Sequence, residues 1–126
     1  MCLHDAVVSF DPQHIRLLAH GHHDLDHPLR RVGGLSSVHL SEYGAQAMAV
    51  HGGLLARAEG RRAEPGLLVS LRGVNLFVTR LDDLPGPLET EAELVASTPT
   101  SWQYQFRIHH DGVLLGEGRA MVMLHA

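Results

Sequence analysis

The residues best suited to chemistry gather near the start of the chain. Residues 19–29 read AHGHHDLDHPL, and four histidines and two aspartates occupy the eight positions from His20 to His27. Imidazole and carboxylate groups can bind a metal ion together, and an imidazole can also move a proton near neutral pH. Histidines in a polar loop are often only solvated. The stretch is therefore a metal site, one half of an acid–base pair, or a solvated loop.

The metal interpretation rests on His20, His22 and Asp24. Their spacing resembles the start of the His-x-His-x-Asp-His motif, with which metallo-β-lactamase-type hydrolases bind zinc. The sixth position is Leu25 instead of histidine, and the chain is short for that fold. The other ligands would have to come from histidines scattered far along the chain. We therefore predict no functional metal site.

Glu42 is the second candidate for a catalytic residue. It lies near the start of a segment with helical periodicity. At 100° per residue, Gln46 lies about 40° and Ala49 about 20° from Glu42 on the helix wheel, so the three share one face. His39 lies about 60° away, at the edge of this face. His51 lies about 180° away, so we interpret it as structural.

The helix that carries Glu42 is predicted from about Val38 to Ala58, with Ser36 and Ser37 as candidate N-caps. Six of the ten residues from Gly44 to Gly53 are glycine or alanine, which weakens helix propensity at the glycines. Small side chains let another backbone approach closely. We therefore expect this helix to be embraced by a curved sheet or packed near a symmetry mate.

Strand-like segments surround the helix. Two precede it, at about 2–10 and 14–19, and a loop rich in glycine, histidine, aspartate and proline follows them from His20 to Gly34. In WQYQFRI, large residues alternate at Trp102, Tyr104 and Phe106, so we predict that they pack in the core. Four strands are predicted after the helix, at about 67–81, 88–97, 102–109 and 113–125.

Length and composition narrow the class of protein. The 126 residues suit one domain spanning 1–126, and no apolar run approaches the roughly 20 residues that cross a bilayer. The formal net charge of −4 argues against general nucleic-acid binding. The chain has a single cysteine, Cys2, and nothing resembling a signal peptide, so we expect a soluble cytoplasmic protein without an internal disulfide.

This order of elements resembles the hotdog fold, an α+β fold in which an antiparallel six-stranded sheet is wrapped around one long central helix. HLSEYGAQAMAVHGGLLA looks like the acidic-residue helix of β-hydroxyacyl-acyl-carrier-protein dehydratases, with Glu42 and Gln46 at the matching spacing. HPLRRVGGL, EYGAQAMAVHGGLL and LDDLPGPLETEAE are most similar to the hotdog dehydratases of aryl-polyene-type biosynthesis. Most of the chain is covered, and EYGAQAMAVHG is the most specific segment.

The resemblance implies removal of water from a 3-hydroxyacyl thioester to give a trans-2-enoyl thioester. Glu42 would be the acid, supported by Gln46. The fatty-acid dehydratases place their base 14 residues before the acid, where this chain has Pro28, so His27 and His22 both stay open as the base. Backbone N–H groups near Ser37 and Val38 would hold the thioester oxygen, with His39 at the edge of the site; the relatives have glycine at the position of Ser37.

The resemblance also implies the partners. The substrate would be carried by acyl carrier protein or coenzyme A, no cofactor is needed, and the active site would lie between the subunits of a homodimer or a higher homo-oligomer. An acidic carrier protein could dock on Arg30/Arg31 or Arg61/Arg62. Relatives carry a Pro-His segment just before the position where this chain begins, so we expect a truncated or divergent start. The alternatives are a hotdog thioesterase and a non-catalytic acyl-binding or assembly subunit.

Overall fold

A computed structural model describes residues 3–21, 39–60, 66–79, 81 and 83–124 of the chain. Within these ranges two strands are followed by one long helix and four further strands, which is the predicted order. The elements are β1 (Ala6–Phe10), β2 (His14–Ala19), α1 (Leu40–Ala58), β3 (Gly66–Leu76), β4 (Leu88–Ser97), β5 (Ser101–His110) and β6 (Val113–Leu124).

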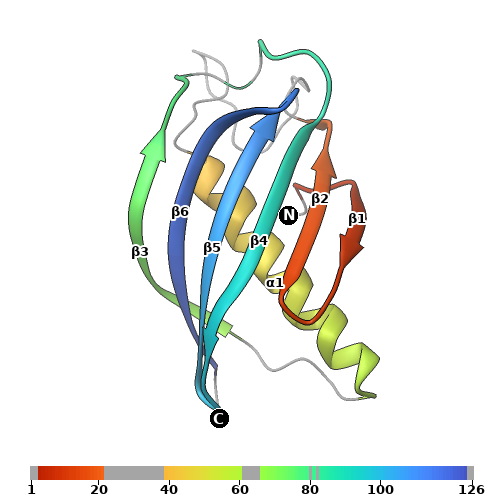
Figure 1. The fold of residues 1–126 in the computed structure, drawn as a ribbon, viewed down its shortest axis with the longest axis vertical. Coiled ribbons are helices and arrows are strands. Elements are labelled where there is room, and N and C mark those ends of the chain that lie inside the picture. Colours follow the sequence, from red (N-terminus) through yellow and green to blue (C-terminus); the bar gives the residue numbers. More distant parts are fainter. Residues whose placement is uncertain (1–2, 22–38, 61–65, 80, 82, 125–126) are drawn as a thin grey trace.

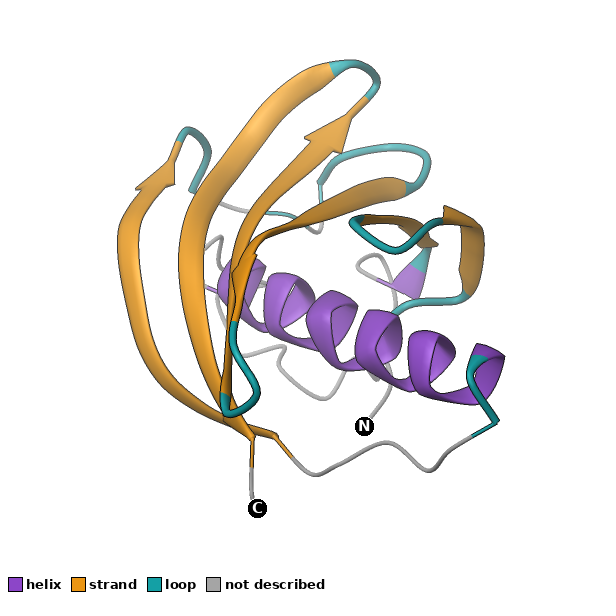
Figure 2. Cartoon of the chain, turned by 60° about the horizontal axis from the view of Figure 1, so that its bottom comes forward, coloured by secondary structure: helices purple, strands orange, loops and turns teal. Residues whose placement is uncertain are grey.

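The six strands form one sheet in the order β1-β2-β4-β5-β6-β3. Every neighbouring pair is antiparallel. The strand that follows the helix, β3, pairs with the last strand, β6, so β1 and β3 lie at opposite edges of the sheet (Figure 1). This sheet curves around α1, as Figure 2 shows.

The core lies between the concave face of the sheet and α1. Alternate residues of the strands point inward, including Ile15 and Leu17 on β2 and Tyr104, Phe106 and Ile108 on β5, and all five are buried. Trp102, partly buried, packs against the same core. The predicted inward face of the aromatic strand is thus confirmed.

The glycines of α1 permit the close approach of helix and sheet. A Cβ on Gly44 would lie 2.6 Å from the ring of Phe106, and a Cβ on Gly118 of β6 would lie 2.7 Å from the same ring. The ring of Phe106 therefore packs directly against the backbone of both glycines, between helix and sheet. By contrast, a Cβ on Gly53 would meet nothing within 4 Å. The expectation of a helix embraced by a curved sheet is confirmed.

Three boundaries differ from the sequence prediction. His39 occupies the N-cap position of α1, without a side-chain capping bond, whereas Ser36 or Ser37 was expected there. The first strand begins only at Ala6, because the residues before it lie against α1. The third strand ends at Leu76, and a bend follows it. In the part of the chain that the structure describes, no helix is long and apolar enough to cross a membrane.

Candidate active site

The first turn of α1 brings together two of the side chains predicted for the site. The Nδ1 atom of His39 lies 3.1 Å from Oε1 of Glu42, three residues later on the same helix. The side chain of His39 is 20% exposed and that of Glu42 is 43% exposed. The pair can therefore be reached from solvent in the single chain. Glu42 also stands in the first turn, where the helix dipole favours a negative charge.

The segment before β1 lies along the helix next to this pair. The backbone N–H of Leu3 donates to the side-chain carbonyl of Gln46 at 2.7 Å, and Nε2–H of His4 donates to the backbone carbonyl of Tyr43 at 2.8 Å. Gln46 therefore anchors the beginning of the chain to the face of α1 that carries Glu42. The support for Glu42 that we predicted for Gln46 stays a prediction.

His4 is a buried imidazole that the sequence analysis missed. It is 8% exposed, and its ring meets the ring of Tyr43 edge-on. Burial lowers the pKa of His4 and raises the pKa of Tyr43 to about 12, so both groups are neutral at pH 7. A histidine among the apolar residues of LHDAVV has no spacing that would have marked it as functional.

The end of β3 reaches the start of α1 and leaves apolar side chains exposed there. A Cβ on Gly116 would lie 2.7 Å from Cδ1 of Leu40 and 3.3 Å from Cδ2 of Leu76, so the first residue of α1 and the last residue of β3 meet over this glycine. Leu76 is nevertheless 37% exposed, and Phe77 after it is 58% exposed. An apolar surface therefore begins near Leu40, the first residue of α1.

His51 belongs to a different, buried network. Its Nε2–H donates to the backbone carbonyl of Asp11 at 2.7 Å, and its Nδ1 accepts from the hydroxyl of Tyr104 at 2.7 Å. Both ring nitrogens are satisfied in the neutral form, and burial lowers the pKa of His51. His51 therefore links α1 to β5 and to the β1–β2 turn, which agrees with the structural role predicted for it.

The remaining predicted site residues, His22, His27, Ser37 and Val38, lie outside the described residues, and so do Arg30/Arg31 and Arg61/Arg62. His22 and Asp24 of the metal interpretation fall there as well. Within the described ranges no three histidine, cysteine, aspartate or glutamate side chains are grouped so that they could hold a metal ion. Glu42, His39 and Gln46 are the predicted residues whose positions are known.

The sequence and the fold both resemble known proteins. The model of the ApeP-like family, described as ApeP dehydratase, matches residues 1–125. The fold is similar to the dehydratase heterocomplex ApeI:P from Xenorhabdus doucetiae, with a TM-score of 0.88 and 19% identity over 99% of this chain and 84% of that chain.

Two further solved structures have the same fold at lower similarity. A mutant of the thioesterase SAV0944 from Staphylococcus aureus has a TM-score of 0.71 and 12% identity over 96% of this chain and 93% of that chain. A mutant of the phenylacetic acid degradation protein PaaI from Thermus thermophilus has a TM-score of 0.66 and 16% identity over 95% of this chain and 92% of that chain. No curated protein sequence matches the chain. These likenesses confirm the hotdog fold.

Proposed function

The chain belongs to the ApeP-like dehydratase family, and from this premise we propose that it removes water from a 3-hydroxyacyl thioester and releases the trans-2-enoyl thioester. The family name gives the class of reaction, because dehydratases are lyases. The proposal adds the substrate. The acyl group would be carried by acyl carrier protein or coenzyme A in fatty-acid or aryl-polyene-type biosynthesis in the cytoplasm.

The observation that carries the proposal is the place of Glu42. Its carboxyl group stands in the first turn of α1, partly exposed and in contact with an imidazole. The exposed apolar end of β3 lies near Leu40, the first residue of the same helix. An elimination needs a group that gives a proton to the departing hydroxyl, and a carboxyl group in such a place can give it. Partial exposure leaves room for the substrate to reach the carboxyl oxygen.

The reaction divides between an acid and a base. Glu42 gives its proton to the C3 hydroxyl, which leaves as water when the C3–O bond breaks. The base, His22 or His27, takes the proton from C2, and the electrons of that C–H bond form the C2=C3 double bond. Backbone N–H groups near Ser37 and Val38 would stabilise the negative charge that develops on the thioester oxygen.

His39 and Gln46 would act as neighbours of the acid. His39 contacts Glu42 directly, so it holds the carboxyl group in one orientation. Gln46 binds the backbone of Leu3 and thereby fixes the segment that lies beside the acid. Each would thus position the reacting groups, with His39 also close enough to Glu42 to touch a substrate bound there.

The proposed assembly is a homodimer formed through the β3 side of the sheet. β3 is an edge strand, and an uncovered edge is ready to pair with another chain. Leu71 and Val74 on β3, like Leu76 and Phe77, are apolar and exposed in the single chain. β1 is also an exposed apolar edge, but β3 meets the start of α1 through Leu40. A partner at β3 would therefore lie near the start of α1.

Two alternatives have specific support. The thioesterase SAV0944 shares the fold, so a carboxylate in this place could instead direct a water molecule at the thioester carbonyl. The dehydratase ApeI:P is a heterocomplex, so the second subunit could be a different hotdog chain and this chain an acyl-binding or assembly subunit. Neither alternative changes the expected importance of the β3 side.

The test is the product formed from a 3-hydroxyacyl thioester of acyl carrier protein. We expect enoyl thioester and no free thiol, and we expect Glu42→Gln to reduce turnover by a factor of about 100 or more. Glu93→Gln is the matched control, because Glu93 lies on β4 beside His14, away from α1. Release of free thiol would favour the thioesterase instead. Turnover unchanged in Glu42→Gln would overturn the role of the acid.

A further inference from the structure

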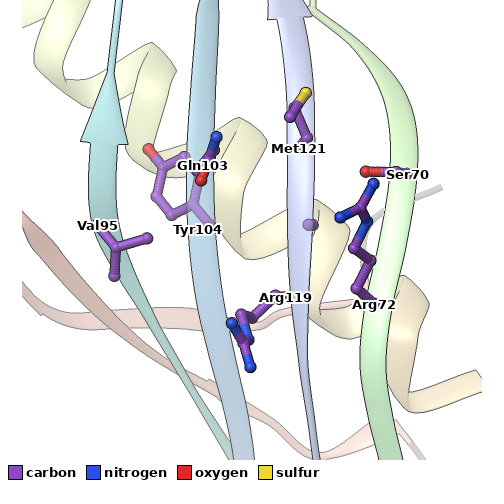
Figure 3. Close-up of a pocket in the computed structure, with 8 residues that line it drawn as sticks. Ser70, Arg72, Val95, Gln103, Tyr104, Arg119 and Met121 are labelled. Carbon is purple, nitrogen blue, oxygen red and sulfur yellow. The ribbon is translucent and has the colours of Figure 1, made fainter.

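A cavity lined by both polar and apolar side chains lies on the outer face of the sheet, on the side opposite α1. Its volume is about 150 Å³, and it extends across β3, β6, β5 and the end of β4. The polar side chains that line it are Ser70, Arg72, Gln103 and Arg119, and Figure 3 shows them around β6 with the helix behind the sheet. Nothing in the proposed dehydration uses this place.

Two arginines line this cavity from paired positions in the sheet, and their guanidinium ends extend in different directions (Figure 3). Arg72 of β3 and Arg119 of β6 are partners in the antiparallel ladder, so their side chains leave the sheet on the same face. Like charges opposite each other destabilise a pair of strands. An anion bound between the two arginines would weaken this repulsion and so stabilise the sheet.

No carboxylate among the described residues neutralises the two arginines. The ion pairs there that contain an arginine belong to Arg16, which contacts Glu89 at 2.9 Å and Glu91 at 3.3 Å. Glu117, two positions before Arg119 on β6, accepts a hydrogen bond from Asn75 at 3.3 Å. Among the described residues, Arg72 and Arg119 thus have no carboxylate partner for their positive charges.

The backbone of β3 makes room for this arrangement. The register of β3 against β6 shifts between Arg72 and Asn75, and Gly73 in this bulge has φ of 60°, a conformation that favours glycine. A Cβ on Gly73 would stand 3.9 Å from Nε of Arg119. Gly73 therefore lies within van der Waals reach of the Arg119 side chain, and its backbone conformation sets the bulge beside Arg72.

We propose that this cavity binds a phosphate group. Guanidinium groups match phosphate oxygens with paired N–H donors, and the Ser70 hydroxyl and the Gln103 amide add neutral donors at the rim. The cavity volume of about 150 Å³ is several times the roughly 30 Å³ that one water molecule occupies in the liquid. A tetrahedral anion therefore fits. The phosphate can be free, or it can belong to coenzyme A.

The test measures binding of inorganic phosphate by calorimetry, against sodium chloride of equal ionic strength. We expect saturable binding to the unchanged protein and affinity lower by a factor of about ten in Arg72→Gln and in Arg119→Gln, because each variant removes charge-assisted hydrogen bonds. Arg16→Gln is the control, since Arg16 is an exposed sheet arginine that already has acidic partners, and it should bind phosphate as before. Absent saturation, or equal affinity in all variants, would overturn the proposal.

The source of the phosphate is decided by two further ligands. If coenzyme A is the natural ligand, it should bind more tightly than inorganic phosphate and lose affinity in Arg119→Gln, whereas pantetheine, which has no phosphate, should not respond to that substitution. If free phosphate is the ligand, coenzyme A should bind no more tightly than inorganic phosphate.

Folding and catalysis can be separated from this binding. Arg119→Gln without phosphate should melt no lower than the unchanged protein, because it removes a repulsion, and a large loss of melting temperature would count against the repulsive pair. Glu42→Gln should bind phosphate normally even when turnover is lost. Failure of the dehydration proposal would therefore leave this site intact, and the reverse also holds.

Discussion

His39 and Glu42 form a side-chain contact of 3.1 Å across the first turn of α1, between the N-cap residue and the acidic residue three positions later. The contact gives the Glu42 carboxyl group a side-chain partner at the helix start. A substrate that reaches the first turn of α1 would meet the carboxyl group together with this imidazole.

Replacement of His39 tests this contact. We expect His39→Ala to lower kcat for dehydration by a factor of about ten with little change in KM, because it removes the hydrogen bond that orients the Glu42 carboxyl group. His39→Gln, which keeps a donor at similar reach, should recover part of the loss. Steady-state kinetics measures both variants. A change in KM alone would show that His39 only binds substrate.

Substitution of Gly44 and of Gly53 by alanine distinguishes the effect of core packing on stability from the effect of helix propensity. We expect Gly44→Ala to destabilise the fold by about 1 to 3 kcal/mol, because its Cβ would stand 2.6 Å from the ring of Phe106 and overpack the core. We expect Gly53→Ala to stabilise it by about 0.5 to 1 kcal/mol, since its Cβ meets nothing within 4 Å and alanine favours the helix. Urea denaturation measures both; equal effects would contradict the tight packing at Gly44.

The hydroxyl of Tyr104 is expected to matter for stability. Tyr104→Phe removes the donor to Nδ1 of His51 and leaves that nitrogen buried without this hydrogen bond. We expect the free energy of unfolding to fall by about 1 to 3 kcal/mol. Trp102→Phe, which changes a partly buried neighbour on the same strand face, is the comparison for lost aromatic contact. An unchanged melting curve for Tyr104→Phe would argue against the buried network.

Acid should destabilise the protein through its buried histidines. Burial lowers the pKa of His51 and of His4 below the unfolded value of 6.5, so between the two pKa values the unfolded chain binds more protons than the folded one. Stability is therefore lost as pH falls below about 6.5. We expect His51→Gln to reduce the slope of Tm against pH in this range, while exposed His20→Gln leaves it unchanged. The same slope in both variants would contradict the prediction.

The assembly is tested at Phe77, which is 58% exposed beside the end of β3. We expect Phe77→Glu to shift the protein from dimer to monomer and to lower turnover with it, because a charge would be placed in an apolar contact. Val113→Glu is the matched control, since Val113 is 62% exposed where β6 begins. Sedimentation measures the mass. A dimer unaffected by Phe77→Glu would move the interface away from the β3 side.

The sequence alone predicted which face of each helix or strand is buried, because this periodicity depends only on residues that are neighbours in the chain. The wheel positions placed Glu42 and His51 on opposite sides of α1, and the alternation in WQYQFRI put Tyr104 and Phe106 inside, as the structure has them. The small residues of the helix indicated a close approach, and Phe106 makes it against Gly44. The EYGAQAMAVHG segment identified the fold family through its residues alone.

Contacts between distant segments came only from the tertiary structure. The position of β3 beside β6, the burial of His4 against Tyr43 and the pairing of Arg72 with Arg119 in the ladder each join residues far apart in the chain. The N-cap moved from the expected serines to His39, since packing of Leu40 against β6 and β3 helps to decide where the helix begins. Local patterns determine which face of an element is apolar, whereas the free energy of the whole packed core decides which faces meet.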